Sequence, residues 1–139
     1  MIGLLVITHC QLAKELLEAA GFIVGSIEAA EHISIDTTLD SQVLRDMIGK
    51  KIKFLDKGQG VLILTDMFGG TPSNLALSFL QKDKIEVVTG INLPMVIAVA
   101  HNRNSNNLAE IANIAKNAGS RSISLASELL KPTNKEENS

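Results

Sequence analysis

His9 and Asp66 are the two side chains of this sequence best placed to do chemistry together. Each lies two residues beyond a run of branched apolar residues, Ile2 to Ile7 before His9 and Val61 to Leu64 before Asp66. Such runs predict strands that are buried on both faces, as in a parallel sheet. A carboxylate that accepts a hydrogen bond from one imidazole nitrogen fixes the tautomer and leaves the other nitrogen as a nucleophile. The pair therefore indicates a nucleophilic histidine with the aspartate as its orienting partner.

The turn after Asp66 has the features of an anion-binding segment. Gly69 and Gly70 leave the backbone bare, and a helix is predicted to start at Thr71, the candidate N-cap, and to include Ser73. A helix start carries unpaired N–H groups and the positive end of the macrodipole, so we expect these four residues to hold a phosphate. A nucleophile, its orienter and an anion cradle together suit phosphoryl transfer onto histidine. The alternative is an ordinary turn in which the glycines serve geometry alone.

The predicted elements bring these residues to one edge of a sheet. Strands are expected at residues 2–7, 32–35, 61–64, 85–89 and, as a short last strand, 122–125, with helices at 12–24, 43–55, 73–80, 94–100 and 108–118. This alternation predicts an α/β fold with a parallel sheet and right-handed crossovers. Ligands of such sheets bind beyond the carboxyl ends of the strands, near the point where strand order reverses, so His9 and Asp66 should meet there.

The first predicted helix has one apolar face that we expect to pack inward. The residues of this face are Leu12, Leu16, Ala19, Ala20 and Ile23. Their spacing of three and four residues is typical of an amphipathic helix.

Composition limits the class of protein. The chain has 139 residues, of which 45% are hydrophobic, and this is enough for one domain, expected at residues 1–130. Residues 131–139 are polar and are expected to form a disordered tail. A net charge of -2, no long basic run and no Trp or Tyr argue against nucleic acid as a partner. No apolar run approaches the roughly 18 residues of a membrane span.

Other chemistries fit this sequence less well. There is no phosphate-binding loop of the Gly-Lys-Ser/Thr type for a nucleotide, no Gly-x-Ser-x-Gly elbow and no third clustered ligand for a metal, so neither metal nor cofactor is expected. His32 and His101 are interpreted as a strand-surface residue and a loop residue. The single cysteine, Cys10, excludes an internal disulfide and is consistent with a reducing compartment, so we expect a cytoplasmic protein.

Three segments resemble the IIA components of the mannose family of the bacterial phosphoenolpyruvate-dependent sugar phosphotransferase system. They are Ile7-Thr8-His9, the stretch from Leu64 to Asn74 with Asp-Met-Phe-Gly-Gly-Thr-Pro, and Gly90-Ile91-Asn92-Leu93-Pro94-Met95. The resemblance covers roughly residues 1 to 128 and implies that His9 receives a phosphoryl group from the carrier HPr and passes it to a IIB component. It further implies a doubly wound three-layer α/β/α fold. Four strands would be parallel, and a short antiparallel strand around Ile123 to Leu125 would be exchanged in a homodimer.

Two departures keep alternatives open. Cys10 stands where the family often has glycine, which adds bulk beside the nucleophile. The chain is also expected to stop after the IIA domain, so that a IIB partner would be a separate protein. Without such a partner, the protein would be a regulatory sensor of phosphorylation state. A third alternative is an α/β ligand-binding domain that is never phosphorylated.

Overall fold

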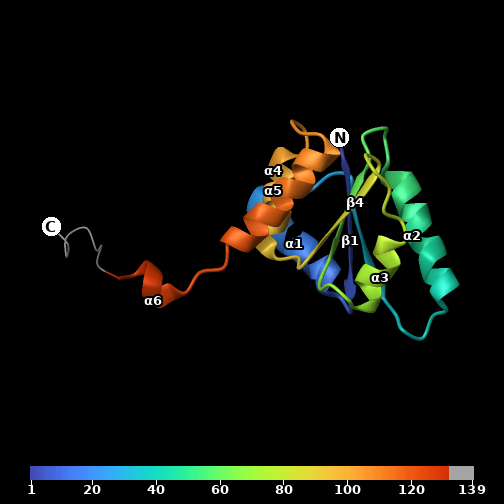
Figure 1. Ribbon diagram of the computed structural model, residues 1–139, viewed down its shortest axis with the longest axis horizontal. Coiled ribbons are helices and arrows are strands. Elements are labelled where there is room, and N and C mark those ends of the chain that lie inside the picture. The colour runs from blue at the N-terminus through green and yellow to red at the C-terminus, as the bar shows by residue number, and fades with distance from the viewer. Residues whose placement is uncertain (132–139) are drawn as a thin grey trace.

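The computed structural model describes residues 1–131 as one α/β unit (Figure 1). Its elements, in chain order, are β1 (Gly3–His9), α1 (Leu12–Val24), β2 (Ala30–Ile35), α2 (Ser41–Leu55), β3 (Val61–Thr65), α3 (Thr71–Leu77), β4 (Ile85–Thr89), α4 (Leu93–Asn102), α5 (Leu108–Arg121) and α6 (Ala126–Leu129). The predicted tail, apart from Lys131, lies outside the described residues. Within the described part of the chain, no helix is long and apolar enough to cross a membrane.

The four strands form one parallel sheet in the order β2-β1-β3-β4. From β1 the chain crosses to β2 on one side and then returns to place β3 on the other side of β1. The strand order therefore reverses between β1 and β3, where Ile7 lies opposite Thr65. The predicted fold class is confirmed, and the reversal point lies between the strands that precede His9 and Asp66.

Helices cover both faces of the sheet and make the three layers (Figure 1). On one face, Leu4 and Leu62 belong to a core cluster shared with α1, α4 and α5. On the other face, Leu5 and Ile63 belong to a second cluster shared with α2 and α3. Successive side chains along β1 and along β3 thus point alternately into the two cores. Because both faces of these strands are buried, their sequences are continuous apolar runs.

Helix α1 buries only part of the face predicted for it, because Ala20 lies inside whereas Leu12 and Ile23 do not. Ala13 and Ala20 are fully buried, and Leu17 packs beside them, whereas Leu12 and Ile23 are exposed. The helix carries two adjacent apolar stripes, and the stripe with the small alanines is the one that faces the sheet and α4. Small side chains allow the close approach of packed elements, so the inward face was set by packing and not by side-chain size.

The predicted last strand is not formed within this chain. Ser122 is the C-cap of α5 and has helical backbone angles, residues 123–125 have no regular secondary structure, and no strand of residues 1–131 lies beside the outer edge of β4. Figure 1 shows the segment leaving the body of the molecule before α6. An extended segment is a strand only where an edge receives it. Exchange between two subunits stays a prediction.

Two glycines before β3 show how tightly its start is held. Gly60 and Gly58 both have positive φ, +88° and +104°, and both donate N–H hydrogen bonds to Asp56 Oδ1. A Cβ at position 60 would lie 2.7 Å from the carbonyl oxygen of Lys84, whereas position 58 faces open space. Both positions require a positive φ, but only position 60 has no room for a Cβ atom.

Gly60→Ala should therefore destabilise the fold more than Gly58→Ala. The positive φ costs about 1–2 kcal/mol at either position, and overpacking against the Lys84 backbone adds about 1–3 kcal/mol at position 60 alone. Urea denaturation of both variants measures the difference. Equal losses of unfolding free energy would show that the chain before β4 yields to the added methyl group without cost.

Candidate active site

Asp66 holds His9 by both its backbone and its ring. The N–H of His9 donates to Asp66 Oδ2 at 2.9 Å, and the ring atom Nδ1 lies 2.7 Å from the same oxygen. The other carboxylate oxygen, Oδ1, accepts from the N–H of Met67 at 3.0 Å. Because an ionised carboxylate only accepts, Nδ1 carries the proton of this bond and Nε2 keeps a free lone pair. The structure thus brings together the two residues predicted to meet.

The carboxylate of Asp66 stays ionised at neutral pH. Burial raises its pKa, but hydrogen bonds from the His9 backbone and ring, attraction to a protonated His9 and the hydrogen bond from Met67 outweigh this effect. The pKa of Asp66 therefore lies below its ordinary value. The side chain of Asp66 is 12% exposed and that of His9 is 43% exposed, so the acid is sheltered while the ring remains accessible.

Thr8 fixes the peptide that carries His9, a role that the sequence analysis missed. Its buried hydroxyl donates to the carbonyl oxygen of His9 at 3.0 Å and accepts from the N–H of Ala13 at 2.7 Å. The N-cap residue of α1, Gln11, makes no side-chain capping bond, so Thr8 satisfies one of the free donors of this helix start. Local capping rules do not link residues five apart, and so no sequence signal would have identified this contact.

Gly70 lies against the free side of the His9 ring. A Cβ built at Gly70 would lie 3.0 Å from Cε1 and 3.6 Å from Nε2 of His9. The backbone of Gly70 has φ -85° and ψ 169°, a conformation that any residue adopts. Position 70 therefore requires the absence of a side chain, because a methyl group would occupy the space beside Nε2 of His9.

The other residues predicted to bind phosphate differ in exposure: Ser73 is buried within the glycine turn, whereas Thr71 is exposed. The N–H of Gly69 donates to the hydroxyl of Ser73 at 3.0 Å, and that buried hydroxyl donates in turn to the carbonyl oxygen of Gly70. Thr71 is exposed and is the first residue of α3, not its N-cap; Gly70 takes the N-cap position. Ser73 thus shapes the glycine turn. A direct role of Gly69, Gly70, Thr71 or Ser73 in holding phosphate stays a prediction.

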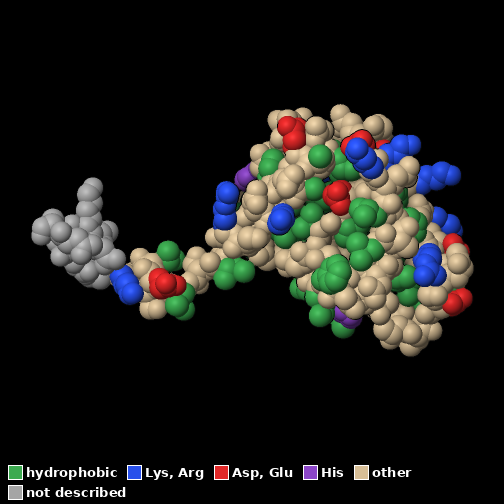
Figure 2. Space-filling model, viewed as in Figure 1, with side chains coloured by type: hydrophobic (Ala, Val, Ile, Leu, Met, Phe, Trp, Pro, Cys, Tyr) green, Lys and Arg blue, Asp and Glu red, His purple; other side chains and the backbone are tan. Residues whose placement is uncertain are grey.

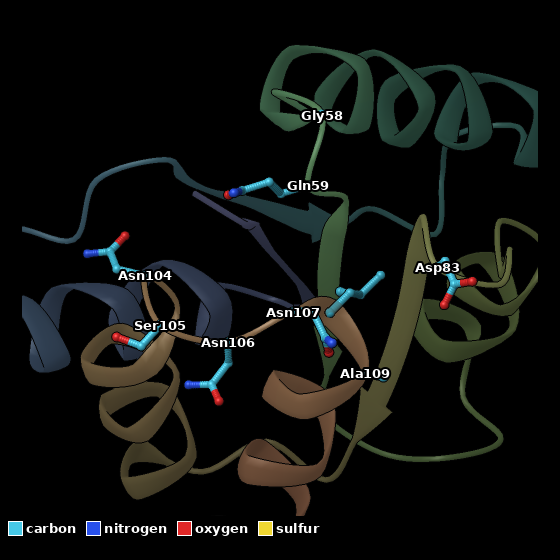
Figure 3. Close-up of a pocket in the computed structure, with 9 residues that line it drawn as sticks. Gly58, Gln59, Asp83, Asn104, Ser105, Asn106, Asn107 and Ala109 are labelled. Atoms are coloured by element: carbon cyan, nitrogen blue, oxygen red, sulfur yellow. The ribbon is translucent and has the colours of Figure 1, made fainter.

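Other candidate groups lie away from this pair. His32 is exposed on β2, and His101 is exposed in the last turn of α4, not in a loop as predicted. Within residues 1–131 there is no group of three or more His, Cys, Asp or Glu residues that would hold a metal ion. A hollow of about 600 Å³ lies at the amino ends of β3 and β4, away from His9, and has amide and hydroxyl groups but no histidine in its lining (Figure 3).

Comparison with known proteins identifies relatives of the whole α/β unit. Residues 3–116 match the family EIIA-man, described as the fructose IIA component of the phosphotransferase system (PTS). The fructose-specific EIIA component of Bacillus subtilis (strain 168) is 29% identical over 94% of this chain and 90% of that protein. The sorbose-specific EIIA component of Lacticaseibacillus casei is 32% identical over 79% of this chain and 80% of that protein.

A solved structure gives the same result for the fold. The PTS IIA protein associated with the fucose utilization operon of Streptococcus pneumoniae has a TM-score of 0.81 and 28% sequence identity, over 93% of this chain and 96% of that one. The matched family region includes both His9 and Asp66.

Gly70→Ala should leave the protein folded but slow any reaction at Nε2 of His9. The added methyl group crowds Cε1 and forces the ring away from its position beside Asp66. We expect a loss of about 10²-fold or more in the rate of phosphorylation, since misplacement of about 1 Å has that effect. Single-turnover labelling with a phosphohistidine donor measures the rate.

The matched control is Gly21→Ala, which introduces the same change inside α1 where nothing lies within 4 Å. This variant should react like the wild type and gain slightly in stability. Unchanged labelling of Gly70→Ala would show that the ring does not need the space above position 70.

Proposed function

Because this chain belongs to the mannose family of IIA components, which are phosphotransferases of the sugar phosphotransferase system, we propose that His9 accepts the phosphoryl group of phospho-HPr and passes it to a IIB component. One observation carries the proposal: Asp66 Oδ2 lies 2.7 Å from Nδ1 of His9 and so leaves Nε2 as the nucleophile. The proposal includes a cytoplasmic location, where donor and acceptor would both be encountered.

The transfer needs no proton movement at His9. The lone pair of Nε2 forms a bond to the phosphorus of the donor's phosphohistidine, and the donor's N–P bond breaks with its electron pair returning to the donor's ring. Nδ1 of His9 keeps its hydrogen toward Asp66, so the phosphorylated ring is cationic and the carboxylate compensates its charge. The same steps in reverse deliver the phosphoryl group to the acceptor group of the IIB component.

The surface beside His9 suits contact with another protein. Leu12, Met67 and Phe68 expose 44%, 56% and 72% of their surface, and all three lie in segments next to His9 or Asp66. Exposed apolar residues around a reactive side chain are typical of a protein-docking surface. A ring that is itself 43% exposed is open to a phosphohistidine carried on a protein donor.

A regulatory sensor would use the same phosphorylated His9, so the acceptor distinguishes the two roles. If the protein is a carrier, phosphorylated protein mixed with the cognate IIB component should lose its phosphoryl group within the time of a turnover. Retention of the label in the presence of every IIB component of the source cell would favour the sensor.

We also propose that the protein is a homodimer in which residues 122–125 of each subunit lie on β4 of the other. Two observations support this arrangement. Residues 123–125 follow the end of α5 without regular secondary structure or strand pairing, and the outer edge of β4 is left open by residues 1–131. A short strand becomes stable when a sheet edge receives it.

His9→Ala should accept no phosphoryl group while it keeps its fold. The protein is incubated with phosphoenolpyruvate, enzyme I and HPr, and the mass gain of one phosphoryl group is measured. In the wild type the label should be lost in acid and kept in alkali, as expected for phosphohistidine and unlike an aspartyl phosphate. Labelling of His9→Ala, or a base-labile label in the wild type, would move the acceptor away from His9.

Asp66→Asn should be slowed far more in transfer from HPr than Thr71→Ala. The amide keeps the shape of the carboxylate but loses the charge that compensates a cationic ring, and it no longer selects the tautomer. Loss of such positioned help costs about 10² to 10⁴ in rate, whereas Thr71 is exposed and its hydroxyl makes no hydrogen bond within the described residues. Equal single-turnover rates of the two folded variants would contradict the orienting role of Asp66.

A further inference from the structure

The segment after α5 exposes apolar side chains that the single chain does not cover. Ile123, Leu125, Leu129 and Leu130 are 62% to 83% exposed, and α6 buries no residue. A helix as short as α6 is not stable in water without packing partners. The exit of the segment is nevertheless fixed, because Asn92 Nδ2 donates to the carbonyl oxygen of Gly119 and to the hydroxyl of Ser122. An ordered exit followed by uncovered leucines indicates a receiving surface on another molecule.

The outer edge of β4 is open at only one end. The N–H and C=O groups of Ile85 point away from β3 and are both bonded to Gln81, at 2.8 and 3.1 Å. Backbone groups alternate along a strand, so Val87 and Thr89 present the other outward-facing positions. In the single chain, the N–H of Val87 donates a hydrogen bond to the side chain of Glu86. The edge therefore accepts a short strand beside residues 87–89 and is closed at residue 85.

A groove begins where the edge closes. It measures about 420 Å³ and combines the apolar side chains Ile52, Phe79 and Ile85 with two cations, Lys53 and Lys84, and one carboxylate, Asp56. It lies on the face of the sheet covered by α2 and α3. The hollow on the opposite face at this end of the sheet is lined mainly by Asn, Gln and Asp side chains and does not suit leucines (Figure 3).

We propose that this groove receives α6 and Leu130 of a second copy of the chain. The inference rests on the homodimer proposed above and adds a docking site to it. A strand of residues 123–125 that runs antiparallel to β4 covers about 10 Å and delivers the next residues to the amino end of β4. Leu129 and Leu130 then fill the apolar part of the groove, and Glu128 lies beside Lys53 and Lys84.

The requirement that the strand lead into the groove also selects one pairing register with β4. With Val87 opposite Leu125 and Thr89 opposite Ile123, both apolar side chains lie on the face of Val87, which packs against the core shared with α2 and α3. A shift by one residue would turn them to the face of Glu86 and Val88. The first register continues the apolar surface into the groove; Figure 2 shows hydrophobic side chains over the middle of this side of the molecule.

The groove is tested with the double variant Leu129→Ala, Leu130→Ala. Both side chains are exposed in the single chain, so its fold should not change. The Kd of the dimer, measured by sedimentation velocity, should rise at least about a hundredfold, because four leucine contacts are lost per dimer. Phe22→Ala, which removes a side chain that is 93% exposed on α1, is the matched control and should leave Kd unchanged.

The outcomes separate this inference from the proposals on which it stands. An unchanged Kd of the double variant would overturn the groove and leave the dimer intact. A wild-type protein that is monomeric at all concentrations would overturn both the dimer and the groove. Phosphorylation of His9 is measured independently and is affected by neither result.

The register is tested by oxidation of paired cysteines in a Cys10→Ser background. Val87→Cys with Leu125→Cys should form a disulfide between copies, since directly opposite residues have Cβ atoms about 4.5–5.5 Å apart. Val87→Cys with Ser124→Cys should cross-link poorly. The reverse ranking would overturn the proposed face, and no cross-linking by either pair would overturn the pairing with β4.

Discussion

The parallel pairing of β1 with β3 is the constraint on which the site depends. These two strands are neighbours in the sheet although they are separated in sequence by β2 and α2, and their carboxyl ends point the same way. Ile7 lies opposite Thr65, so the next residues of both strands emerge side by side. His9 and Asp66 meet because the strand order reverses between β1 and β3. The two cores on either side of the sheet hold this pairing in place.

One carboxylate oxygen of Asp66 positions both the backbone and the ring of His9. Asp66 Oδ2 binds the N–H of His9 and faces its ring nitrogen Nδ1, so that the backbone and the side chain of His9 share one acceptor. Thr8 holds the carbonyl oxygen of the same residue. With its peptide and ring both anchored, His9 has little freedom left to lose, and this preorganisation would lower the cost of the proposed transfer between two proteins. Gly70 completes the arrangement by leaving the space beside Nε2 empty.

The two ends of the sheet serve different purposes. The carboxyl end holds the accessible ring of His9 and exposed apolar side chains that suit a transient partner. The amino end of β4 has a closed edge and an apolar groove that suit a permanent one. In the proposed dimer, the groove that takes α6 and Leu130 lies at the end of the sheet opposite to His9, whereas the pairing beside residues 87–89 lies at the carboxyl end, where Thr89 is opposite Thr65.

Features that depend on the local order of residues could be predicted from the sequence. Apolar runs that end at polar residues predict buried parallel strands, and the Gly-Gly turn predicts the start of α3, so the fold class and the pairing of His9 with Asp66 could be predicted. Tertiary structure alone decided the rest. Thr8 bonds a residue five positions away, α1 turns its alanine stripe inward to fit α4, and residues 122–125 stay unpaired in one chain. Each of these depends on which surfaces come within contact distance, and no pattern along the chain encodes that distance.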